Sequence, residues 1–374
     1  MYEDLNSEFI QCLAKVKGDV LYGRLFDYTP TWPSYLSVLR ELKKFSKMFL
    51  NHEKDPLTQV RKYPYQMDIL IKLSKRSDDL LWLLPYKNLI NPISRDYLFM
   101  KMFPEVKLDF GKQHKMLIDR SQILTVSFKH LSLGNSKSLR CGLSVEFRNE
   151  EAVGYGVLRE WFFIICQELF DPKVSLFLAC SNDRRRFFPN PAPVVPRHLN
   201  YFAFAGRVIA LALMHKVQVG ITFAPVFFYQ LAGGVISLDD IQDADPVMYK
   251  SCKEILKMDA DSVDSDVLGL TFGREFKEFG SRRVVELCPG GNSIIVNSKN
   301  REQYIELLIQ HCFVKSIAEN LSYFTRGFGD ILCERGLQKI FFQNLELEDL
   351  DLMLLGSGEA ISGKDWKAHT EYHG

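Results

Sequence analysis

The sequence has almost no surplus of charge of either sign. Its 374 residues include 47 lysines and arginines against 46 aspartates and glutamates, so the net charge at pH 7 is +1. Proteins that bind nucleic acid or an anionic membrane usually carry a marked basic surplus or patch. The charge balance therefore argues against nucleic acid and membranes as partners, and it favours proteins or small molecules.

Targeting and membrane-spanning segments are also missing. Residues 1–5 contain neither the basic cluster nor the apolar run of a secretory signal. No stretch approaches the roughly 18 consecutive apolar residues that a transmembrane helix needs. The best candidate, residues 201–213, is interrupted by Gly206 and Arg207. We therefore expect a protein of the cytoplasm or the nucleus.

Familiar catalytic and cofactor motifs are absent as well. The eight cysteines form no C-x-x-C pair, which argues against a zinc site or a thioredoxin-type redox motif. No P-loop, dinucleotide fingerprint, H-E-x-x-H or G-x-S-x-G occurs. The histidines have no metal-ligand spacing, so we expect neither a metal nor a cofactor. The run Asp183–Arg186 either grips an acidic partner or forms a solvated loop.

What is present is a helical pattern with one mixed segment. Residues 1–113 carry apolar residues at helical spacing and predict a helical N-terminal extension without a chemical motif. Beyond them, Ile123–Phe128 and Leu143–Phe147 look like short strands. A helix after Gly154 and a largely apolar central helix at Asn200–Met214 are expected next.

Residues 245–313 predict a smaller α/β segment between helical stretches. Asp245 is a good N-cap for a helix on which Met248 and Cys252 share a face. Val284–Leu287 and Ser293–Val296 flank a Pro-Gly-Gly turn and predict a hairpin. A helix capped at Asn297 or Ser298 follows, and the chain is helical again after residue 313. The predicted fold class is therefore mainly α with a smaller α+β part.

Several short motifs occur in an order that resembles a known family. In chain order they are Gly156–Phe163 (GVLREWFF), Phe202–Arg207 (FAFAGR), Asp245–Ser251 (DPVMYKS), Leu270–Phe272 (LTF), Asn300–Arg301, Phe324–Phe328 (FTRGF), Glu346–Leu347 with Leu355–Gly356, and Trp366–Tyr372 (WKAHTEY). Together they resemble the N-lobe of HECT domains, over residues 114–374. The resemblance implies a large helical subdomain (114–244 and 314–374) with an inserted subdomain (245–313) that binds the ubiquitin-conjugating enzyme.

The resemblance implies a ubiquitin-protein transferase. In the family, ubiquitin passes from a conjugating enzyme to a cysteine of a C-lobe, in a T-x-x-T-C-type context, and then to a substrate lysine. None of the eight cysteines has that context, and the sequence stops at Gly374. We therefore expect the catalytic cysteine to lie beyond Gly374 and this chain to dock the conjugating enzyme only. The alternatives are a non-catalytic binding module that occupies conjugating enzymes and an unrelated helical scaffold.

Family positions that contact the conjugating enzyme can be carried over residue by residue. They correspond to Met248, Cys252, Leu268, Leu270, Tyr304 and Leu308. Each helical pair, Met248 with Cys252 and Tyr304 with Leu308, is one turn apart and therefore shares a face. The resemblance thus implies an apolar groove for a partner loop. The alternative, that these side chains only fill the core between strand and helices, stays open.

Overall fold

The computed structural model describes residues 2–21, 32–49, 55–74, 80–86, 89–106, 113–193, 197–265, 269–278, 281–334, 336–356, 363–368 and 370. The chain divides into two compact units. Unit 1 comprises Met1–Glu105 and Leu332–Asp349, and unit 2 comprises Val106–Ile331 and Leu350–Gly374. The described helices include none that is both long and apolar enough to span a bilayer.

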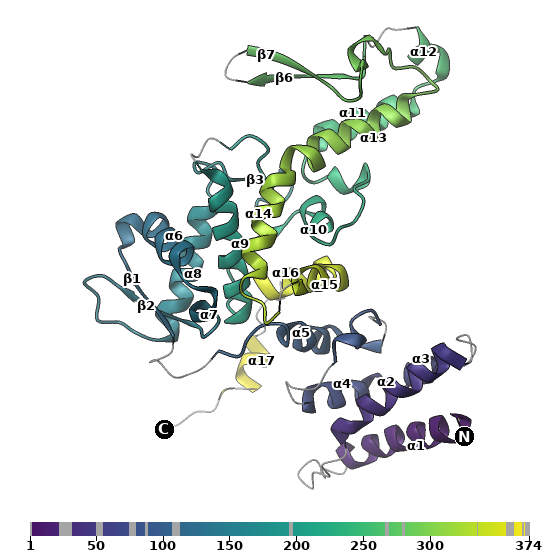
Figure 1. Cartoon of the computed structure of the whole chain (residues 1–374), viewed down its shortest axis with the longest axis vertical. Coiled ribbons are helices and arrows are strands. Elements are labelled where there is room, and N and C mark those ends of the chain that lie inside the picture. The colour runs from purple at the N-terminus through teal and green to yellow at the C-terminus, as the bar shows by residue number, and fades with distance from the viewer. Residues whose placement is uncertain are drawn as a thin grey trace. The chain divides into compact units, whose positions relative to one another are not determined.

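Within the described residues of unit 1, the regular secondary structure is helical (Figure 1). Its α-helices are α1 (Tyr2–Leu21), α2 (Trp32–Phe49), α3 (Pro56–Val60), α4 (Pro64–Leu73), α5 (Pro92–Met100) and α15 (Leu337–Asn344). Phe341 of α15 packs edge-on against Phe99 and Phe103, with ring centroids 5.3 and 5.7 Å away. The Arg95 guanidinium donates two hydrogen bonds to the Asp349 carboxylate, at 3.0 and 2.7 Å. These contacts join the early part of the chain to residues 332–349 within unit 1.

Unit 2 combines helices with two small sheets and one hairpin. We call residues 245–314, which contain the hairpin, its smaller part, and the rest of unit 2 its larger part. The strands of the larger part are β1 (His114–Ile118), β2 (Leu143–Phe147), β3 (Phe177–Ala179), β4 (Arg186–Pro189) and β5 (Thr222–Phe223). β1 and β2 pair in parallel, and β4 lies between β3 and β5. The helices there are α6 (Ile123–Leu133), α7 (Ser136–Leu139), α8 (Tyr155–Leu169), α9 (His198–Met214), α10 (Pro225–Leu231), α14 (Ala318–Gly329) and α17 (Gly363–Ala368). Helix α16 (Leu347–Leu355) begins in unit 1 and belongs to unit 2 from Leu350 onward.

The core of unit 2 is built on α9 and α14, which lie side by side (Figure 1). Helix α9 is buried from Val208 to Met214, as its apolar sequence predicts. The two helices approach closely because each has a glycine at the contact. A Cβ on Gly206 would lie 2.1 Å from the Phe324 carbonyl oxygen, and one on Gly327 would lie 1.9 Å from the Ala203 carbonyl oxygen. Only glycine fits at such backbone contacts.

Three predictions for this part have clear outcomes. The strand at Leu143–Phe147 and the helix after Gly154 are confirmed as β2 and α8. The strand at Ile123–Phe128 is wrong, because these residues form the start of α6. Buried residues of α6 recur every four positions at Ile123, Ser127 and Leu131, so the helix presents one face to the core. The predicted fold class, mainly α with a smaller α+β part, is confirmed.

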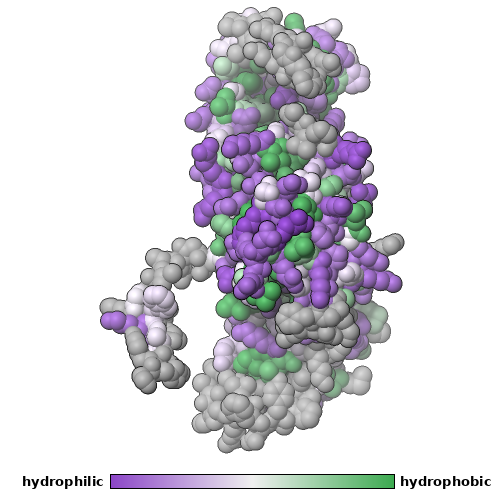
Figure 2. Space-filling model, turned by 90° about the vertical axis from the view of Figure 1, so that its left-hand side faces the viewer, coloured by the Kyte–Doolittle hydropathy of each residue, from purple (hydrophilic) through white to green (hydrophobic). Residues whose placement is uncertain are grey.

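The surface of the molecule is predominantly polar on the side seen in Figure 2, where hydrophobic residues form small separate patches. Among exposed apolar residues of unit 2, Leu133 is 78% exposed and Val235 is 87% exposed. Isolated apolar side chains of this kind are normal on soluble proteins.

The smaller part of unit 2 contains α11 (Pro246–Lys257), α12 (Ala260–Asp264), β6 (Gly273–Glu278), β7 (Ser281–Glu286) and α13 (Arg301–Ile309). Helix α13 continues through a π-helix at Gln310–Val314 towards α14 (Figure 1). The predicted hairpin around the Pro-Gly-Gly turn is wrong, because Val284–Glu286 belongs to β7 and pairs with β6. The turn itself is held by the Glu286 carboxylate, which accepts hydrogen bonds from the Gly290 and Asn292 N–H groups at 3.1 and 3.4 Å.

Candidate docking site for a partner protein

The residues predicted to contact a partner come from three segments of the smaller part of unit 2. Met248 and Cys252 lie on α11, Tyr304 and Leu308 lie on α13, and Leu270 lies in the segment that precedes β6. The sixth, Leu268, lies outside the described residues. Helices α11 and α13 pack against each other, as Figure 1 shows. Five of the six residues are thus brought into one region of the fold.

Helix α11 begins as its sequence predicts. The Asp245 carboxylate accepts a hydrogen bond from the Met248 N–H at 2.9 Å, and Pro246 occupies the first turn. The helix is further held by Lys253, whose ammonium group lies 2.9 Å from the Asp239 carboxylate. This pair is exposed to solvent, so it contributes little to stability. The pair instead helps to orient α11, because Asp239 belongs to a separate 3₁₀ helix (Asp239–Ile241).

Helices α11 and α13 run antiparallel. The Arg301 side chain at the start of α13 donates hydrogen bonds to the carbonyl oxygens of Ile255 and Met258 at the end of α11. Moving away from that junction, α11 runs backward to Met248 while α13 runs forward to Leu308. Met248 and Leu308 therefore lie towards the same end of the helix pair.

The middle of the helix pair is closed and apolar. Cys252 is 1% exposed and Tyr304 is 6% exposed, and the Tyr304 ring lies edge-on to Phe272 with centroids 5.5 Å apart. Burial raises the pKa of the Tyr304 hydroxyl, and the nearby Cys252 raises it further. The pKa of the Cys252 thiol is likewise raised, first by burial and then by Asp245. Both groups stay neutral at physiological pH and act as packing residues.

Around this closed centre, Met248, Leu270 and Leu308 are half-buried. We call these three residues the docking surface. Leu270 is held in place because its carbonyl accepts a hydrogen bond from the Val296 N–H at 2.9 Å, beside a bridge between Thr271 and Ile295. Solvent-exposed apolar residues adjoin two of these segments, since Val247 is 75% and Ile295 is 51% exposed. For Cys252 and Tyr304 the observed burial agrees with core packing, and a groove formed by all six residues stays a prediction.

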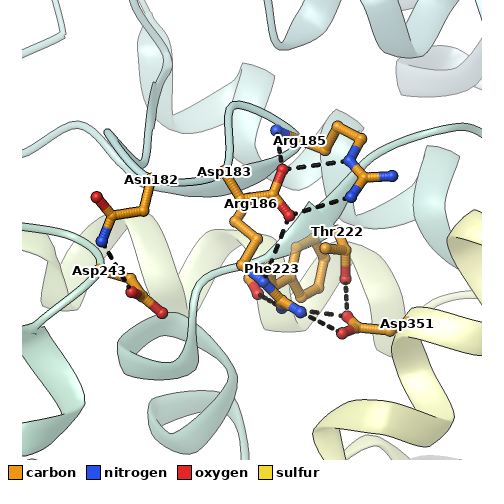
Figure 3. A network of polar contacts seen from close by, with 8 residues as sticks. All are labelled: Asn182, Asp183, Arg185, Arg186, Thr222, Phe223, Asp243 and Asp351. Carbon is orange, nitrogen blue, oxygen red and sulfur yellow. Dashed lines mark hydrogen bonds and ion pairs between the residues drawn. The ribbon is translucent and has the colours of Figure 1, made fainter.

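Within the run Asp183–Arg186, the Arg186 side chain serves the protein's own structure. Figure 3 shows the Arg186 guanidinium between the Asp351 carboxylate and the Phe223 carbonyl, which it reaches at 3.3 and 3.0 Å. The Thr222 hydroxyl donates to the same carboxylate. Arg186 therefore joins β4 and β5 to α16 and is not free to grip an acidic partner.

Three further titratable groups of unit 2, on His215, Cys180 and Cys312, are buried. His215 is 7% exposed, and its Nε2 accepts a hydrogen bond from the Leu143 N–H at 3.2 Å. Burial lowers the pKa of His215 to about 4, so the ring is neutral and can accept. Burial raises the pKa of the Cys180 thiol to about 12 and that of Cys312 to about 11. Within the part of the chain that is described, no cluster of three or more His, Cys, Asp or Glu residues could hold a metal ion.

Sequence comparison relates this chain to ubiquitin ligases. The family model described as "HECT-domain (ubiquitin-transferase)" matches residues 163–374. The E3 ubiquitin-protein ligase UPL5 of Arabidopsis thaliana is 48% identical over 369 residues, which are 97% of this chain and 42% of that protein. The E3 ubiquitin-protein ligase HACE1 of Danio rerio is 36% identical over 69% of this chain and 27% of its own length. The chain thus spans less than half the length of either relative.

Proposed function

Because the chain belongs to the HECT family of ubiquitin transferases, we propose that its docking surface binds a ubiquitin-conjugating enzyme. The observation that carries this proposal is the antiparallel pairing of α11 and α13, which directs Met248 and Leu308 towards the same end of the pair. Leu270, from a third segment, is also half-buried. Apolar side chains of this kind can contact the apolar residues of a partner's loop.

For the whole protein, we propose transfer of ubiquitin from the conjugating enzyme to a substrate lysine through a cysteine thioester. In the first step an acceptor thiolate attacks the thioester carbonyl, and the conjugating enzyme's thiolate leaves. One thioester replaces another, so the step needs little driving force and depends on an accessible thiolate and on placement. In the second step the lysine amine attacks the new thioester, and an amide forms as the protein thiolate leaves.

We assign to α11, α13 and the segment that contains Leu270 the task of positioning the conjugating enzyme. Buried cysteines of unit 2 are poor acceptors, because burial raises the pKa of the Cys166, Cys180, Cys252 and Cys312 thiols. A thiol with a raised pKa is rarely a thiolate at neutral pH. The docking surface holds the conjugating enzyme while its thioester is attacked elsewhere.

The test is a titration of the full chain with a panel of ubiquitin-conjugating enzymes. Leu308→Glu places a carboxylate in the docking surface, and desolvating that charge should weaken binding by about tenfold or more. Leu133→Glu is the matched control, because Leu133 is 78% exposed on α6, away from α11 and α13. Equal affinities for the two variants, both folded, would remove the docking assignment.

Tyr304→Ala is a weaker test, because Tyr304 is buried and its removal would leave a cavity. A loss of affinity would then not separate docking from folding. A non-reducing gel of the chain with a ubiquitin-charged conjugating enzyme adds a second readout. A thiol-sensitive ubiquitin adduct would identify one of this chain's cysteines as an acceptor. Binding without an adduct would support docking as the role of this region.

A further inference from the structure

Arg301 connects the two helices of the docking site at one end. Helix α11 ends at Lys257, and the backbone of its C-cap residue Met258 leaves the helical conformation (ψ 144°). The last carbonyl groups of a helix have no partner within the helix and carry partial negative charge. The Arg301 guanidinium donates to the Ile255 carbonyl at 3.1 Å and to the Met258 carbonyl at 2.6 Å. One cationic side chain from α13 therefore satisfies the end of α11.

Asn300, the residue before it, connects α13 to the third segment. Its Nδ2 donates to the Ile295 carbonyl at 2.9 Å, and its Oδ1 accepts from the Asn297 N–H at 2.7 Å. Ile295 is bridged to Thr271, and the next residue, Val296, donates its N–H to the Leu270 carbonyl. The side-chain amide of Asn300 thus holds the segment of Ile295 and Val296, which in turn holds Leu270.

We propose that Asn300 and Arg301 are positioning residues that set the spacing of the docking surface. Together they link α11, α13 and the segment that carries Leu270, which are the three sources of the docking surface. Neither residue belongs to that surface. The inference rests on the proposed docking function, and it adds that the affinity for a conjugating enzyme depends on this pair of side chains.

The test uses isothermal titration of the full chain with two conjugating enzymes, the tightest and the weakest binder found in the panel. Arg301→Met removes the two hydrogen bonds while keeping a long side chain, and we expect the dissociation constant to rise about tenfold. Arg301→Lys keeps one charged donor and should restore part of the affinity. Lys299→Met removes a charge from an exposed neighbouring residue and is the control.

Stoichiometry separates positioning from folding. Unfolded chains lower the number of binding sites without changing the dissociation constant. A docking surface with altered spacing raises the dissociation constant at full stoichiometry. Altered spacing of the docking surface should also change the ratio of the two enzymes' affinities. An unchanged dissociation constant for Arg301→Met, or a loss seen only in stoichiometry, would overturn the inference while docking stands. Failure of the unaltered chain to bind any conjugating enzyme would overturn the proposed function, and the inference with it.

Discussion

Replacing Gly206 with alanine would place a methyl group where α9 and α14 leave no room for one. The new Cβ would lie 2.1 Å from the Phe324 carbonyl oxygen and 2.8 Å from the Phe328 nitrogen. Both atoms belong to the backbone of α14, so no side-chain rotation can relieve the contact. The helices must separate along the main packing contact of unit 2.

The magnitude follows from two opposing effects. Overpacking a well-packed core costs about 1–3 kcal/mol, and a contact between rigid backbones belongs at the upper end of that range. Alanine favours the helix over glycine by about 1 kcal/mol. We therefore expect Gly206→Ala to lower the free energy of unfolding by about 2 kcal/mol.

Denaturant unfolding followed by tryptophan fluorescence measures this change, because Trp161 is fully buried in the same unit. Gly156→Ala is the matched control, since a Cβ there would meet no atom within 4 Å on α8. The control should be neutral or stabilising by up to about 1 kcal/mol. Equal stability of Gly206→Ala and Gly156→Ala would refute the close-approach argument.

Two further predictions concern polar groups in unit 2. The pKa of His215 is about 4 in the folded protein against 6.5 ordinarily, so the folded state favours the neutral ring. Its stabilisation is present above pH 6.5 and is lost as the pH falls towards 4. The loss reaches about 3 kcal/mol, and His215→Gln, which keeps an acceptor for the Leu143 N–H, should flatten the measured pH dependence of unfolding. Asp351→Asn leaves the half-buried Arg186 without its carboxylate and should lower the unfolding free energy by about 1–3 kcal/mol. The more exposed Asp183→Asn should cost less than about 1 kcal/mol in the same denaturation assay, and equal losses would contradict the role given to Asp351.

Features with a strong local cause were predictable from the sequence. The start of α11 follows from Asp245 and Pro246, whose capping chemistry needs no distant partner. The central helix α9 follows from a long apolar stretch rich in small residues. The spacing and the family resemblance also predicted that residues of α11 and α13 lie in one region, which the structure shows, while their role as a docking site stays a prediction.

Features decided by distant contacts were not predictable in the same way. The β-prone residues at Ile123–Phe128 form a helix, because the Trp161 indole donates to Ser127 and α8 and α9 pack against α6. Tertiary packing of this kind overrides local propensity. The roles of Asn300 and Arg301 were also missed, since their hydrogen-bond partners at Ile295, Ile255 and Met258 lie at separations that sequence patterns do not reveal.

The most direct test of the account is hydrogen–deuterium exchange of the full chain with and without a ubiquitin-conjugating enzyme. Partner binding slows exchange of the backbone amides that it covers or steadies. We predict slower exchange in α11, in α13 and around Leu270, with no change in α6. Protection confined to unit 1, or spread over α6 and α8 while α11 and α13 exchange as before, would contradict the claim that this surface docks the conjugating enzyme.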